Sequence, residues 1–130
     1  MVQLSSSTTL LLPILISITN ARSFGFLSHC DSSTLRYHDS YKDPNHLYLT
    51  VQCGTKGVKI NLNTCITNDN GALIWNRNPA NYDNSCINCQ VKEKKFTCEE
   101  CKKSGNGYEE WPTITLNDGI GYSDGKLTCG

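Results

Sequence analysis

The stretch Ile60–Trp75 (INLNTCITNDNGALIW) decides the fold, because the chain contains a second, imperfect copy of it. A shift of 54 residues places it on Ile114–Cys129 (ITLNDGIGYSDGKLTC). An internal repeat defines the architecture, so the chain is predicted to consist of two similar halves. Six matched positions carry the same residue in both copies: Ile60/Ile114, Leu62/Leu116, Asn63/Asn117, Ile66/Ile120, Gly71/Gly125 and Leu73/Leu127.

Each copy predicts a short strand, a corner and a two-stranded hairpin. An apolar–polar–apolar opening is followed by Asn70-Gly71 in the first copy and by Asp124-Gly125 in the second. Such pairs favour a type I′ turn, in which both central residues need a positive φ. An isolated hairpin is only marginally stable in water. We therefore expect each hairpin to be buried against the other copy.

The start of the chain has the pattern of a secretory signal peptide. Leu10–Ile18 is a short apolar core, and Thr19–Ala21 or Ala21–Ser23 supplies a cleavage site with small residues. Residues 1–21 are thus predicted to be removed, with cleavage after residue 21 or 23, and the protein is expected to be secreted and extracellular. The apolar run is too short to span a bilayer, so no membrane insertion is expected. What remains, 24–130, is predicted to be a single domain of two repeats, about 26–75 and 80–130.

The charge balance argues against partners that bind mainly through charge. Twelve basic and twelve acidic residues cancel, so no nucleic-acid partner is expected. The three histidines lie in no pattern that suggests a nucleophile, and neither an enzyme nor a cofactor is predicted. The acidic residues Asp118, Asp124, Glu109 and Glu110 have no spacing that supports glycoside hydrolysis and are interpreted as ordinary surface charge.

Eight cysteines in a small secreted domain predict disulfides. Cys30 and Cys53 frame the segment before the first copy, and Cys86 and Cys101 frame the segment before the second. The sequence also has two CxxC pairs, Cys86/Cys89 and Cys98/Cys101. The residue numbers of Cys86 and Cys101 have the same sum as those of Cys89 and Cys98, as is the case for facing residues of an antiparallel hairpin. The remaining two cysteines are paired by elimination. The predicted pairs are Cys30–Cys53, Cys86–Cys101, Cys89–Cys98 and Cys65–Cys129.

Four thiolates in two CxxC pairs would also suit tetrahedral zinc. An oxidising compartment converts thiols to disulfides, so export favours the disulfides and no metal is expected.

The rest of the chain has no amphipathic helix of useful length, so the class is all-β. Leu47–Val51 alternates and is rich in strand-forming residues, and it is predicted as a strand that ends at Cys53. Asp39–His46 and Asn76–Ser85 are predicted loops. Asparagine is abundant in the loops, and two interpretations stay open: it serves turn geometry, or it forms a hydrogen-bonding surface for a neutral, polyhydroxylated ligand.

The two copies of the repeat resemble the cyanovirin-N homologue family. The resemblance is carried by Ile60–Asn63, Ile66, Asn68, Asn70-Gly71, Leu73 and Trp75, by the echo of this pattern from Ile114 to Leu127, and by the four framing cysteines. It implies an all-β, pseudo-twofold, tandem-repeat fold that is stapled by disulfides and exchanges its hairpins between repeats. It also implies a lectin that binds glycans or glycoproteins, often through α-linked mannose, in up to two shallow pockets without metal.

The resemblance also implies where those pockets lie. One would contain Thr67, Asn68, Asn70, Asn81, Asn84, Ser85, Lys102, Lys103 and Ser104. A weaker second pocket would contain His29, Lys56, Ser123 and Asp124. In the first, Thr67 and Asn70 stand where mannose-binding relatives have acidic groups, so the sugar specificity is left open.

Two alternatives remain at this point. The protein could be a non-lectin secreted interaction protein or effector whose scaffold has lost sugar binding. The hairpins could be exchanged within one chain, giving a monomer, or between two chains, giving a swapped dimer.

Overall fold

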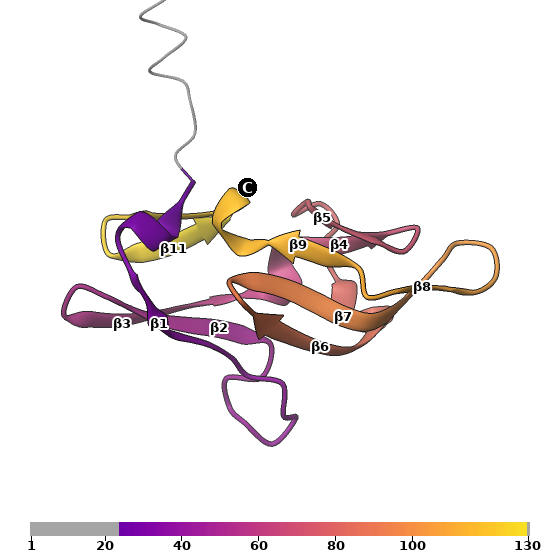
Figure 1. Ribbon diagram of the computed structural model, residues 1–130, viewed down its shortest axis with the longest axis horizontal. Helices are drawn as coiled ribbons and strands as arrows, with labels where there is room; N and C mark the ends of the chain where they lie inside the picture. Colours follow the sequence, from indigo (N-terminus) through magenta and orange to yellow (C-terminus); the bar gives the residue numbers. More distant parts are fainter. Residues whose placement is uncertain (1–23, 130) are drawn as a thin grey trace, which may run out of the picture.

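The computed structural model describes residues 24–129 (Figure 1). The predicted signal peptide, residues 1–21, lies outside the described residues. The all-β class predicted from the sequence is confirmed, because the regular structure consists of short antiparallel strands joined by single turns of 3-10 helix. Among residues 24–129, no helix has the length and apolar character needed to cross a membrane.

The first repeat forms a three-stranded antiparallel sheet followed by a separate hairpin. Its elements are η1 (Phe26–Ser28), β1 (Asp31–Tyr37), β2 (Tyr48–Cys53), β3 (Lys56–Asn61), η2 (Leu62–Thr64), β4 (Ile66–Asp69) and β5 (Ala72–Trp75). The sheet order is β1-β2-β3, and β4 pairs with β5 alone.

The second repeat has the same plan. Its elements are η3 (Tyr82–Asn84), β6 (Cys86–Lys92), β7 (Lys95–Lys102), β8 (Tyr108–Glu110), β9 (Thr113–Thr115), η4 (Leu116–Asp118), β10 (Ile120–Ser123) and β11 (Lys126–Cys129). Strands β6, β8 and β9 all pair with β7, and β10 pairs with β11. The turns η2 and η4 occupy matching positions and form the corner that leads into each hairpin.

The two repeats exchange their hairpins within this chain. The β4–β5 hairpin of the first repeat packs beside β9 of the second, and β11 of the second repeat packs against β3 of the first (Figure 1). Each half of the molecule thus combines the sheet of one repeat with the hairpin of the other. This arrangement gives each hairpin the apolar partner surface that it needs in order to be stable.

Two matching points join the halves across the pseudo-twofold axis. The repeat places Cys65 at the position of Gly119, and Trp75 at the position of Cys129. At one point, Cys65 and Cys129 form a disulfide. At the other, the indole of Trp75 covers Gly119 so closely that a Cβ there would lie 2.0 Å from a ring carbon. One contact is covalent and the other is close packing, but both link a corner of one repeat to a strand end of the other.

The core is built from the repeated apolar positions. Leu62 and Ile66, together with their counterparts Leu116 and Ile120, are completely buried. The ring of Phe96 fills the second half, edge-on to neighbouring tyrosines.

All eight cysteines are buried in or packed against this core, and they form four disulfides: Cys30–Cys53, Cys65–Cys129, Cys86–Cys101 and Cys89–Cys98. In the ladder of β6 with β7, Cys86 lies opposite Cys101 and Cys89 opposite Cys98. The sulfurs that could have formed a thiolate zinc site are therefore used in disulfides.

The disulfide between the halves is expected to contribute more stability than a local one. Cys65 and Cys129 are 64 residues apart, whereas Cys89 and Cys98 are 9 apart. The loop-closure entropy of the unfolded chain then predicts a loss of about 4 kcal/mol for Cys65→Ala/Cys129→Ala and about 2.5 kcal/mol for Cys89→Ala/Cys98→Ala. Denaturant unfolding of both double variants measures the difference. Equal losses would show that the contact between the two halves does not depend on the Cys65–Cys129 disulfide.

The contact between Trp75 and Gly119 is expected to tolerate no side chain. Gly119→Ala forces a methyl group into the indole ring, and overpacking of this kind costs about 1–3 kcal/mol or more. Gly105→Ala is the matched control, because no heavy atom lies within 4 Å of a Cβ at that position. A melting temperature of Gly119→Ala equal to that of the control would contradict this close contact between Trp75 and Gly119.

Candidate functional site

The first candidate site forms where the tip of the β4–β5 hairpin meets the second repeat. Asn70 and Gly71, the two turn residues, have φ values of 51° and 94°, as a type I′ turn requires. Gly71 is buried, and a Cβ there would lie 2.6 Å from the Cβ of Glu109 on β8. Because glycine has no Cβ, the hairpin tip can approach β8 this closely.

Asn68 fastens the hairpin to the second repeat. Its Nδ2 donates to Ser85 Oγ at 2.8 Å and to the backbone oxygen of Lys102 at 2.9 Å. Its Oδ1 accepts from Gly71 N at 2.7 Å. Both amide protons are used inside the protein, so Asn68 positions the site and has no donor left for a ligand.

Asn70 reaches across the same junction. Its Oδ1 accepts from both the backbone N and the Oγ of Ser104, each at 2.9 Å. Within residues 24–129, its Nδ2 has no protein partner at hydrogen-bond distance. This amide donor is exposed and available to a ligand.

Glu109 is a further candidate residue at this junction, outside the pocket that the resemblance implies. Its carboxylate lies 3.5 Å from Lys103 Nζ and its side chain covers Gly71. In the β7–β8 ladder Glu109 lies opposite the buried Cys101, which turns it toward the hairpin. A shallow hollow of about 260 Å³ lies here; it is lined by Asn70, Gly71, Ala72, Leu73, Glu109, Pro112 and Thr113.

We call this region the hairpin site. It consists of Asn68, Asn70, Ser85, Lys102, Lys103, Ser104 and Glu109. Three further residues of the predicted pocket are not part of the hairpin site. Thr67 is half-buried opposite Ile74, and Asn84 is exposed next to Ser85. Asn81 Oδ1 accepts from Asn63 Nδ2 at 3.3 Å, which ties it to the turn around η3.

The second set of predicted residues gathers at the β10–β11 hairpin. The ring of His29 lies 5.8 Å from that of Tyr122, and Lys56 Nζ lies 3.4 Å from where a Cβ on Gly125 would be. Asp124 occupies the first position of this turn, with a φ of 54°, and follows Ser123 directly. In this half, Tyr122 stands at the repeat position of Asn68, and its ring packs beside that of His29.

The bridging role of Asn68 predicts a structural cost when it is removed. Asn68→Ala leaves Gly71 N, Ser85 and the Lys102 carbonyl without their partner, and is expected to lower the free energy of unfolding by roughly 2 kcal/mol. Asp69→Ala is the control, because Asp69 is exposed and makes no side-chain hydrogen bond within residues 24–129. Urea unfolding measures both; a loss for Asn68→Ala no greater than that of the control would remove Asn68 from its bridging role.

Comparison with known proteins places this arrangement in a family. The family model described as CVNH domain matches residues 26–128. No curated protein matches the chain significantly. The structure of TbCVNH from T. borchii is 23% identical, covers 84% of this chain and 100% of its own, and has a TM-score of 0.59. A MoCVNH3 variant in complex with (N-GlcNAc)4 is 15% identical, with coverages of 85% and 100% and a TM-score of 0.63. A designed cyanovirin-N homologue lectin, LKAMG, is 14% identical, with coverages of 84% and 100% and a TM-score of 0.60. The chain therefore belongs to the cyanovirin-N homologue (CVNH) family, as the resemblance of its repeats predicted.

Proposed function

We propose that this protein is a secreted lectin that binds neutral glycans at the hairpin site. The observation that carries the proposal is the group of polar atoms around the shallow hollow. The Glu109 carboxylate can accept from hydroxyl groups, while the Asn70 Nδ2 and the Lys103 ammonium can donate to them. Because Lys103 pairs with Glu109, the charged donor and the charged acceptor lie side by side, and the site offers both to a polyhydroxylated ligand.

Glu109 also supports the proposal by offering an acidic acceptor. Thr67 and Asn70 stand where mannose-binding relatives have acidic groups, so the sequence offered no obvious carboxylate acceptor. Glu109 supplies one from the neighbouring strand, on the other side of the same hairpin tip. We expect it to contribute the strongest single hydrogen bonds to the sugar, because bonds to charged groups contribute about 1.5–3 kcal/mol each.

The family and one of its structures support a neutral sugar as the ligand. The resemblance implies mannose-type glycans, and the MoCVNH3 variant was solved with an N-acetylglucosamine tetramer. Both are neutral, and their hydroxyl groups can pair with the donors and acceptors of the hairpin site. The second set of residues, around Asp124, offers a poorer site because Tyr122 stands there in place of a hydrogen-bonding amide.

Removal of the Glu109 charge is expected to weaken glycan binding without affecting folding. Glu109→Gln keeps the shape that covers Gly71 but loses the charged acceptor, so Kd should rise at least about tenfold. The exposed ion pair with Lys103 contributes little stability, so the melting temperature should change little. A glycan array first identifies the sugar, and calorimetric titration with that sugar then compares the variants.

Lys92→Ala, at the distant end of β6, is the matched control and should bind like the wild type. If the wild type bound no glycan on the array, the alternative would stand: a secreted interaction protein or effector that keeps the CVNH scaffold. If Glu109→Gln bound the sugar with unchanged affinity, the hairpin site would not be where it binds.

A further inference from the structure

A second and larger concave surface lies between the β1–β2 connection and β6. A hollow of about 660 Å³ is bounded by Tyr37 and 39–42 on one side and by Asp83 and 86–89 on the other. An adjoining hollow of about 360 Å³ continues between the β1 residues 35–37 and the β6 residues 88–91. We call the two together the β1–β6 groove. Its volume is in the range of small-ligand sites, and it shares no lining residue with the hairpin site.

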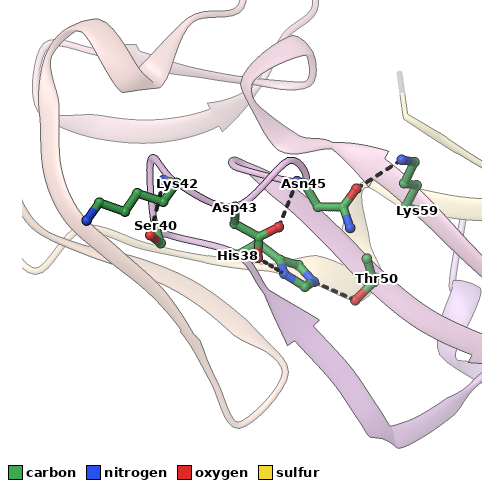
Figure 2. Close-up of polar contacts among 7 residues, drawn as sticks. All are labelled: His38, Ser40, Lys42, Asp43, Asn45, Thr50 and Lys59. Atoms are coloured by element: carbon green, nitrogen blue, oxygen red, sulfur yellow. Dashed lines mark hydrogen bonds and ion pairs between the residues drawn. The ribbon is translucent and has the colours of Figure 1, made fainter.

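The β1–β2 connection, residues 38–47, is fastened to the sheet by its own side chains (Figure 2). His38 lies between Asp43 and Thr50 of β2, with Nδ1 2.8 Å from Asp43 Oδ2 and Nε2 2.9 Å from Thr50 Oγ1. Asp43 Oδ1 accepts from Asn45 N at 2.8 Å, and Asn45 Oδ1 accepts from Lys59 Nζ of β3 at 3.0 Å. A connection held in this way loses little conformational entropy when a ligand binds to it.

This connection presents an exposed aromatic ring at the rim of the groove. The side chain of Tyr41 is 82% exposed, and its ring rests on the ring of His46 with 4.3 Å between centroids. Across the groove, Ile87 of β6 is 53% exposed. A supported aromatic face opposite an aliphatic side chain is suited to a flat ligand with C–H groups on its faces, such as a pyranose ring.

The groove also carries charged groups of both signs. Asp39 and Asp83 line it, and within residues 24–129 neither carboxylate forms an ion pair. Burial raises the pKa of Asp39, and the nearby Asp83 raises it further, whereas His46 lowers it. Arg36 and Lys42 line the same groove, so its charges balance. This balance disfavours a strongly charged peptide or nucleic acid, and the carboxylates and cationic groups can instead pair with hydroxyl groups.

We propose that the β1–β6 groove is a further carbohydrate-binding site, in which a neutral oligosaccharide stacks on Tyr41 and its hydroxyl groups bind Asp39, Asp83 and Lys42. The ligand class rests on the proposed function, but the residues are separate from those of the hairpin site. The groove therefore gives the protein a further binding surface between the first repeat and β6 of the second.

A glycan array with the other sites disabled tests this proposal. Glu109→Gln/Asp124→Asn removes the acidic acceptors of the hairpin site and of the second predicted pocket. This double variant is expected to retain binding to at least one neutral glycan. Adding Tyr41→Ala or Asp83→Asn should weaken that binding at least tenfold, whereas adding Tyr41→Phe, which keeps the ring, should not. Asp118→Asn, an exposed aspartate on η4, is the matched charge control.

Amide shifts in an NMR titration with the glycan from the array then locate the binding. Shifts at 40–42 and 87–89 support the proposal. If Glu109→Gln/Asp124→Asn bound no glycan while the wild type did, the proposal would fall and the hairpin site would stand. If the wild type bound none, both would fall. Residual binding that is insensitive to Tyr41→Ala and Asp83→Asn would also overturn it.

Discussion

Mutual burial of the two hairpins is the constraint on which the rest of the structure depends. A two-stranded hairpin has one apolar face and cannot keep it from water alone. Here the β4–β5 hairpin is covered by the second repeat and the β10–β11 hairpin by the first, so neither half is complete by itself. Cys65–Cys129 and the contact of Trp75 with Gly119 secure this exchange at matching points. The fold should therefore unfold as one unit.

The same exchange creates the hairpin site. Asn68 reaches the Lys102 carbonyl, and Asn70 reaches Ser104, each across 34 positions of sequence. These bonds have two consequences, because they hold the halves together and they also fix the polar atoms around the hollow. Stability and binding are coupled at Asn68, whereas Glu109 lies at the edge of the junction and can serve binding with little effect on folding.

Much of the fold could be predicted because it follows from local rules. The repeated Asn70-Gly71 and Asp124-Gly125 pairs specify the turns, and the spacing of the CxxC pairs matches the ladder of β6 with β7. Glu109 could not be placed in this way, since its direction is set by the pairing of β8 with β7, which no local pattern in the sequence encodes. For the asparagines, the structure shows internal roles, and the ligand-binding surface stays a prediction. Asn68 and Asn81 form internal bonds, and Asn70 keeps a free donor beside the hollow.

The two repeats differ in the connection between the first two strands of their sheets, and this difference accounts for the β1–β6 groove. In the second repeat, β6 and β7 are joined by the two residues Glu93 and Lys94, both with positive φ, as a tight hairpin requires. In the first repeat, the equivalent connection is the whole of 38–47, which is too long for a tight turn and is held instead by His38 and Asp43. This connection extends beside β6 of the other repeat and encloses a hollow there. The groove shares no lining residue with the hairpin site, so its chemistry is free of the constraints that the exchange imposes there.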